Sequence, residues 1–145
     1  MCHNPTADDS PVRPADQMPV ESISLQRMIH RIHSGDALTQ DFTIYGNRAS
    51  LHNYNEVRFP GDRRNCAKCH TSTGYLLPLA GKIDSVTTSR DYATSQGPET
   101  AACLGCHDGR EVAAHASINT APFGEACATC HGAGHDLGVD KVHAR

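Results

Sequence analysis

The sequence has few of the large apolar side chains from which a protein core is built. It has no Trp, three Phe and four Tyr among 145 residues, 38% of the chain is apolar, and the mean hydropathy is -0.48. A chain of this length must bury a large share of its surface to offset the entropy of ordering. We therefore expect one domain whose interior is supplied in part by something other than protein side chains.

The sequence lacks the signals that are typical of several classes of function. No apolar run approaches the roughly 20 residues needed to span a bilayer, and the N-terminus lacks a basic segment followed by an apolar one. The formal net charge of -3, without a basic cluster interleaved with aromatics, argues against nucleic acid as a partner. Serine-hydrolase, phosphate-loop and paired-carboxylate signatures are also absent.

The sequence is rich instead in cysteine and histidine, with 7 and 10 residues. Three segments share the form Cys-x-x-Cys-His, which is the attachment sequence of a c-type haem. On a helical turn, two such thiols lie on one side and can bond both vinyl groups of one porphyrin, while the imidazole reaches the iron. The segments predict thioether-forming cysteines and proximal iron ligands at Cys66, Cys69 and His70, at Cys103, Cys106 and His107, and at Cys127, Cys130 and His131.

Two other uses of paired cysteines compete with haem. Two Cys-x-x-Cys pairs can form a four-thiolate zinc site, and six cysteines can form disulfides in a secreted domain. Zinc would leave one pair without a partner, and neither alternative explains the three histidines, so we favour haem c. Thioether attachment takes place outside the cytoplasm. We therefore expect a periplasmic or cell-surface protein whose export signal was removed or lay upstream.

The N-terminus carries Cys2 and His3, which match the last two residues of a fourth Cys-x-x-Cys-His segment that lacks its first three residues. Either Cys2 holds a fourth haem by one thioether with His3 as its iron ligand, or Cys2 is a stray cysteine. Residues 4–20 contain four prolines, so we expect residues 1–21 to be an extended loop and residues 22–145 to form the haem-binding core of a single domain.

Outside the cysteine segments, one helix is strongly indicated. Apolar residues recur at helical spacing up to Gly35, which predicts a helix over 22–34 with Ser22 as its N-cap. An extended piece is expected at 42–45.

The rest of the chain shows no sustained period. We expect a short strand near 83–87 and a helix that begins at a Thr100 cap, carries the second cysteine segment and continues to His115. The predicted fold class is mainly α with extensive irregular loops, and with haems forming the core.

The remaining histidines are candidates for the second face of each iron. The chain has only three Met, so we expect histidine as the second axial ligand and hence low-potential, six-coordinate haem. His30 and His33 point about 60° apart on one helix, so this helix can ligate two neighbouring haems. The alternative is two unliganded histidines on an amphipathic face. Further ligands are expected at His115, His143 and His52, and His135 is expected to be a loop residue.

Closely packed irons with two histidine ligands each pass electrons but bind no substrate. Electron transfer is therefore the predicted function, by a carrier rather than an enzyme. One alternative is a multihaem reductase of nitrogen or sulfur oxyanions, with one open iron and Arg63, Arg64 and Lys68 near the first segment stabilising developing charge. Another is a homo-oligomer or filament in which Cys2-His3 or a tail histidine completes coordination in the next copy.

Stretches beyond the cysteine segments resemble a known family. Residues 28–35, 58–66, 101–107 and 139–145 look like the C-terminal portion of the OmcA/MtrC-type outer-membrane decahaem c-type cytochromes, which are surface proteins of metal-respiring bacteria. The resemblance implies a bis-histidine electron conduit in extracellular respiration. It also implies that the partners are other multihaem cytochromes or redox proteins, ferric minerals or metal chelates. With three complete segments and no β-rich domain, the chain departs from the ten-haem pattern of that family.

Overall fold

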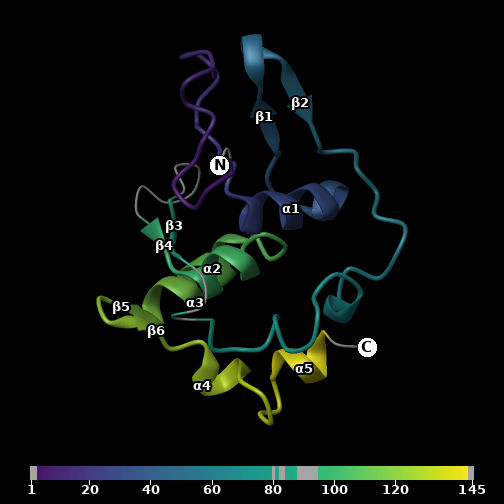
Figure 1. Cartoon of the computed structure of the whole chain (residues 1–145), viewed down its shortest axis with the longest axis vertical. Helices are drawn as coiled ribbons and strands as arrows, with labels where there is room; N and C mark the ends of the chain where they lie inside the picture. The colour runs from purple at the N-terminus through teal and green to yellow at the C-terminus, as the bar shows by residue number, and fades with distance from the viewer. Residues whose placement is uncertain (1–2, 80, 82–83, 88–94, 144–145) are drawn as a thin grey trace.

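Short helices and hairpins joined by long loops make up the chain (Figure 1). The computed structural model describes residues 3–79, 81, 84–87 and 95–143. The α-helices within these residues are α1 (Leu25–Ser34), α2 (Pro98–Cys103), α3 (Arg110–Ile118), α4 (Ala128–His131) and α5 (Val139–Val142). The 3-10 helices are η1 (Gly35–Ala37), η2 (Asn47–Ala49) and η3 (Cys66–Lys68).

The described residues also form three two-stranded antiparallel sheets. They pair β1 (Thr43–Tyr45) with β2 (Leu51–Asn53), β3 (Val86–Thr87) with β4 (Ser95–Gln96), and β5 (Thr120–Ala121) with β6 (Gly124–Glu125).

The expectation of a mainly α fold is therefore only partly right, because the chain is a mixture of helix and sheet with loops. Strands of two or three residues are too short to leave a period in the sequence. Two of them fall where extended structure was expected, β1 within 42–45 and β3 within 83–87. Ile83 lies outside the described residues.

Helix α1 is the longest helix of the described chain, and it begins three residues later than predicted. Ser22 is not its N-cap, because the Ser22 hydroxyl accepts a hydrogen bond from the Ser24 N–H before the helix starts. The predicted end is confirmed at Gly35, which has φ +38. A Cβ atom there would lie 2.1 Å from the Val57 carbonyl oxygen, so only glycine fits this turn.

Two helices, rather than one, occupy the region of the second cysteine segment. Helix α2 ends at Cys103 and α3 begins at Arg110, so the expected continuous helix to His115 is wrong. Glycines at positions 105 and 109 lie in the break, where they lower the helix propensity. Thr100 is not the N-cap, because α2 already begins at Pro98, a residue whose fixed φ suits the first helical position.

Helix α1 buries polar rather than apolar side chains. Arg27, Arg31 and Ser34 are fully buried, whereas Leu25 is 54% and Ile29 is 40% exposed. The buried interior of the described chain is correspondingly polar, since Asp9, Glu21, Glu99 and Asp108 also belong to it.

The chain exposes a large surface for its mass. Its accessible area is 8793 Å², whereas a compact protein of 15.6 kDa exposes about 7,200 Å². The few buried apolar side chains include Phe42, Val86 and Leu104. The described polypeptide therefore wraps loosely, in line with the shortage of core residues in the sequence.

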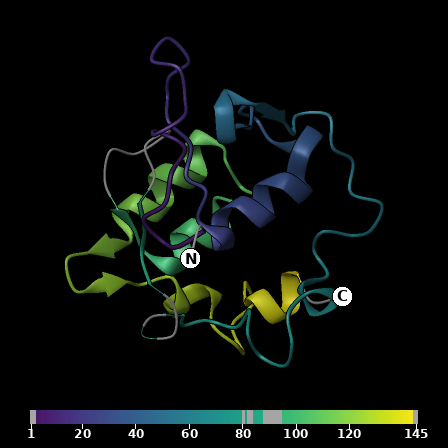
Figure 2. The ribbon, with the colours of Figure 1, turned by 45° about the horizontal axis from the view of Figure 1, so that its top comes forward.

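Helix α1 packs against α2 in the middle of the molecule. Figures 1 and 2 show the β1–β2 hairpin on one side of this pair and the short helices α4 and α5 on the other. In both views η3 lies near α5, close to the C-terminus. The first and third cysteine segments, at η3 and α4, thus lie on the side of α5, and the second begins at the end of the central helix α2.

Candidate functional site

The three Cys-x-x-Cys-His segments adopt the same helical turn. In each, the backbone N–H of the histidine donates to the carbonyl oxygen of the first cysteine at 2.9 Å, as one turn of α-helix requires. These hydrogen bonds join His70 to Cys66, His107 to Cys103, and His131 to Cys127. Since positions three apart lie on one side of a helix, each segment can present two thiols and one imidazole together.

Each segment histidine faces a second imidazole from a distant part of the chain. Helix α1 supplies the partner of the first segment, the tail that of the second, and α3 that of the third. The distances between ring centroids are 6.0 Å for His30 and His70, 5.8 Å for His107 and His143, and 6.2 Å for His115 and His131.

These separations fit two imidazoles that share one metal ion. A metal–imidazole bond is about 2 Å long, so two such bonds in line place the ring centroids about 6 Å apart. In the second pair the Nε2 atoms of His107 and His143 face each other at 3.5 Å. A haem iron takes four ligands from its porphyrin and two from the protein, so one pair per iron matches this donor set.

The hydrogen bond of His131 fixes which of its nitrogens is available. Its Nδ1 lies 3.1 Å from the Leu137 carbonyl oxygen. A metal-binding imidazole usually donates its second ring N–H to such a carbonyl, which orients the ring and leaves the other nitrogen for the metal.

Burial favours the neutral form of two of the partner histidines. Burial lowers the pKa of His30, helped by the charges of His70 and His33 and opposed by a hydrogen bond with the Gln26 backbone. Burial, followed by the charges of His107, Arg64 and His131, also lowers the pKa of His143. A neutral imidazole is the form that binds a metal.

Desolvation by neighbouring protein atoms also favours the protonated form of three of the motif thiols, although Cys103 is exposed and Cys66 and Cys127 are only half-buried. It raises the pKa of Cys66, and it raises the pKa of Cys103 to about 11 and that of Cys127 to about 12. The carboxylates of Glu99 and Glu125 add to the shift at Cys103 and Cys127 because a thiolate beside them would be repelled.

Two further observations concern the six cysteines of the segments and the side chains around them. All six cysteines of the three segments are free thiols there, so no disulfide joins them. No group of three or more His, Cys, Asp or Glu side chains in the described ranges is placed to hold a metal ion, as a four-thiolate zinc site would require.

Three further predicted ligands are not paired with a segment histidine in the described structure. The His33 ring packs edge-on against Phe59 at 5.2 Å, and its Nδ1 lies 2.7 Å from the Ile29 carbonyl oxygen. The other two contact polar atoms nearby. His52 Nε2 lies 3.1 Å from the Ser50 hydroxyl, and His3 Nδ1 lies 2.9 Å from the Ile23 carbonyl oxygen.

Two further residues named in the sequence predictions are Cys2 and His135. Cys2 lies outside the described residues. His135 is exposed in a turn, as expected for a loop residue.

Sequence reasoning missed the residues that hold the segments in place. Glu125, two residues before the third segment, accepts hydrogen bonds from the backbone N–H groups of Glu99 (2.9 Å) and Thr100 (2.7 Å), and so caps the start of α2. Asp108 directly follows the second segment and is buried. The only signal for Asp108 in the sequence is an acidic residue next to the predicted ligand His107, and the partners of both carboxylates are distant in the chain.

A family model for outer membrane cytochromes, described as MtrC/MtrF-like, domains II/IV, matches residues 1–144. Searches of curated proteins and of solved structures gave no significant match. The match covers all three cysteine segments and all three histidine pairs.

Proposed function

The chain belongs to the family of MtrC/MtrF-like outer membrane cytochromes, and from this premise we propose that it relays electrons through bis-histidine c-type haems in extracellular respiration. Haem c supplies reversible one-electron chemistry at its iron. The chain supplies the attachment, the axial ligands and the spacing between sites. The observation that carries the proposal is the set of three histidine pairs with ring centroids 5.8, 6.0 and 6.2 Å apart.

The pairs support one proposed set of protein ligands for each segment. One cofactor would be held by each Cys-x-x-Cys-His segment together with one distal histidine. The sets are Cys66, Cys69, His70 and His30; Cys103, Cys106, His107 and His143; and Cys127, Cys130, His131 and His115.

A fourth haem is proposed at Cys2 and His3. The Nδ1 atom of His3 lies against a backbone carbonyl, which leaves Nε2 for iron. His33 is likewise oriented by a carbonyl through its Nδ1. His33 and His52 are the candidates that remain for a second ligand of such a haem.

With two imidazoles on each of the three proposed irons, no iron has a position left for substrate. This favours a carrier over the alternative, a reductase of nitrogen or sulfur oxyanions. Two of the three cations named for such a reductase are engaged elsewhere, since Arg63 donates to the Ser34 carbonyl at 2.7 Å and Arg64 pairs with Asp62 at 2.9 Å.

The proposed partners are other multihaem cytochromes or redox proteins, with ferric minerals or metal chelates as terminal acceptors. The proposed location is the cell surface or the periplasm. Within the ranges that the structure describes, no helix is long and apolar enough to span a bilayer.

Intact-mass measurement combined with ligand variants tests the proposal. We expect three covalently bound haems, or four if Cys2 is modified, and no binding of carbon monoxide by the reduced protein. His115→Ala and His143→Ala should each open one iron, so that one haem binds carbon monoxide and shows a high-spin resonance. His135→Ala is the matched control, because His135 is exposed and unpaired with any segment. Colourless protein refutes the proposal, and carbon monoxide binding by the unaltered protein favours the reductase.

A further inference from the structure

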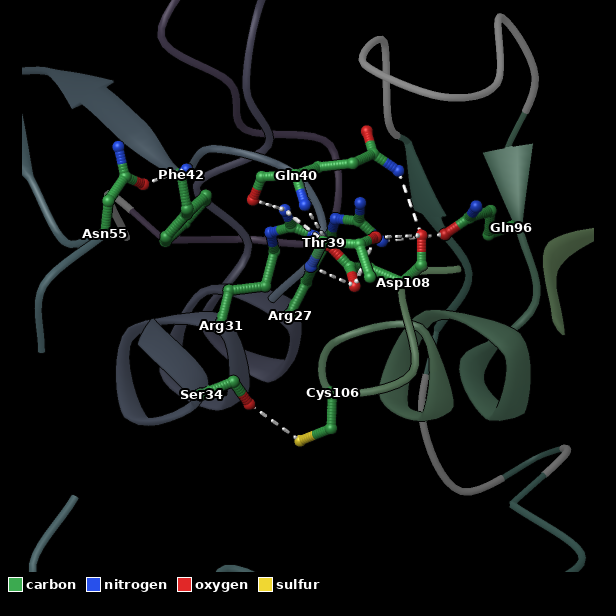
Figure 3. A network of polar contacts seen from close by, with 10 residues as sticks. All are labelled: Arg27, Arg31, Ser34, Thr39, Gln40, Phe42, Asn55, Gln96, Cys106 and Asp108. Atoms are coloured by element: carbon green, nitrogen blue, oxygen red, sulfur yellow. Dashed lines mark hydrogen bonds and ion pairs between the residues drawn. The ribbon is translucent and has the colours of Figure 1, made fainter. Parts of the chain in front are cut away.

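Buried polar contacts join the second cysteine segment to helix α1, which carries His30. Asp108 directly follows His107, and its side chain is only 2% exposed. Figure 3 shows its carboxylate between the α1 arginines and the loop that follows η1. The Arg31 Nη2 atom lies 3.7 Å from Asp108 Oδ2, and the Arg31 side chain is fully buried.

Residues 39 and 40 of that loop surround Asp108 with donors. The backbone N–H groups of Thr39 and Gln40 donate to its two carboxylate oxygens, each at 2.9 Å. The Thr39 hydroxyl donates to Oδ1 at 3.0 Å, and the Gln40 side-chain amide donates to the Asp108 carbonyl oxygen at 3.0 Å. Hydrogen bonds to a charged group are about twice as strong as neutral ones, so this site is held firmly.

The residue on the other side of His107 is also held by α1. The buried Ser34 hydroxyl donates to the Sγ atom of Cys106 at 3.1 Å (Figure 3). The Ser34 carbonyl oxygen in turn accepts from Arg63, three residues before the first segment. The end of α1 therefore contacts the second cysteine segment and the chain just before the first.

The turn of the second segment also packs directly on the proposed ligand of the first haem. A Cβ atom at Gly105 would lie 2.7 Å from the Cβ atom of His30. The backbones that carry His30 and His107 are thus in close contact, and hydrogen bonds on both sides of His107 prevent them from sliding past each other.

We propose that Asp108 is a positioning residue that locks the second haem-binding segment to α1 and so sets the geometry between the His30–His70 and His107–His143 pairs. This inference rests on the proposed electron-transfer function. Asp108 contacts neither iron ligand pair through its carboxylate; it acts through the backbone of His107 and through Arg31. Its buried carboxylate would also stabilise the oxidised form of a haem held by His107.

The test compares Asp108→Asn with Asp136→Asn in haem-loaded protein. Asn keeps the shape of the side chain but removes its charge and one acceptor oxygen. Asp136 is a matched control because it also follows a segment histidine closely, yet it is fully exposed and, among the residues that the structure describes, pairs only with Lys141, at 3.6 Å. We expect Asp108→Asn to shift one midpoint potential to a more positive value and to displace a low-spin resonance, which reports the relative orientation of the two imidazoles. Asp136→Asn should change neither.

The outcomes separate this inference from the proposed function. If Asp108 served stability alone, folded haem-loaded Asp108→Asn protein would keep every potential and resonance, and that result overturns the proposal. If Asp108→Asn protein does not fold, Thr39→Val removes both contacts of the Thr39 hydroxyl with Asp108, and Ser34→Ala removes the contact with Cys106. Each should cause smaller changes in the same resonance, and unchanged resonances in both overturn the proposal as well. Unaltered protein without haem would instead refute the proposed function itself.

Discussion

Replacing Gly105 by alanine tests the contact between the second cysteine segment and His30. The added Cβ atom would lie 2.7 Å from His30 Cβ and 3.0 Å from the Ala102 carbonyl oxygen, whereas carbon atoms prefer a separation of about 3.5–4.0 Å. The Ala102 carbonyl oxygen is a backbone atom and His30 Cβ is bonded directly to the backbone, so neither can rotate away. Helices α1 and α2 must therefore move apart by roughly 1 Å.

The expected cost follows from opposing terms. Overpacking of this kind costs about 1–3 kcal/mol. Gly105 does not have a positive φ, so alanine is allowed there and recovers about 0.4–1 kcal/mol by restricting the unfolded chain. We expect a net loss of about 1–2 kcal/mol, which lowers the melting temperature by roughly 3–8 °C.

Thermal unfolding of the haem-loaded variant, followed by circular dichroism and by the Soret band, measures this loss. The resonance of the haem held by His30 should shift at the same time, because its ligand is displaced. Gly109→Ala is the control, since its Cβ would meet only the flexible Glu111 carboxylate, at 3.3 Å. A Gly105→Ala protein with an unchanged melting temperature and an unchanged resonance would show that α1 and the second segment are not in this contact.

Two other predictions concern the cap of helix α2 and the loss of folding stability at low pH. Glu125→Ala removes the acceptor of the Glu99 and Thr100 N–H groups and should cost about 1–2 kcal/mol in the free energy of unfolding. Glu125→Gln, which keeps one acceptor oxygen, should lose less, and equal unfolding midpoints for all three proteins would contradict the cap. Burial lowers the pKa of His30 and His143 from the ordinary 6.5, so below about pH 6.5 the unfolded chain binds more protons than the folded one. Stability should therefore fall as the pH drops from about 6.5 toward the folded pKa values. His143→Ala should weaken this dependence, and a denaturation midpoint that stays flat over that range would count against it.

The sequence was most informative where the chemistry is local. The three Cys-x-x-Cys-His segments could be found because five adjacent residues carry the whole signal. The end of α1 could be found because glycine is the residue type that fits at position 35. The distal histidines could be proposed as a group from their number, and the spacing of His30 and His33 pointed to α1. Their pairing with individual segments depends on contacts between residues far apart in the chain.

What the sequence could not reveal is how α1 is oriented. Its apolar residues predict a helix whose apolar side faces the core, yet Arg27 and Arg31 are buried and Leu25 and Ile29 are largely exposed. Arginine is rarely buried without a partner, and the carboxylate and carbonyl groups near Arg31 come from Asp108 and Gln40, which have no visible relation to it in the sequence. The pairing of the short strands into hairpins could not be predicted for a similar reason, because tertiary contacts rather than periodicity define it.

The histidine pairs would also act as cross-links that tie the chain into loops. His30 and His70 are about 40 residues apart, and His107 and His143 are 36 apart. By the chain-entropy estimate used for disulfides, each closure would lower the conformational entropy of the unfolded chain and so stabilise the folded protein by about 4 kcal/mol. The third closure, between His115 and His131, lies entirely inside the second, whereas the first shares no residue with either. The haem-loaded chain would therefore consist of a loop closed at His70 and a double loop closed at His143, joined by the contacts of α1 with the second segment, and the tail would be as essential to stability as any helix.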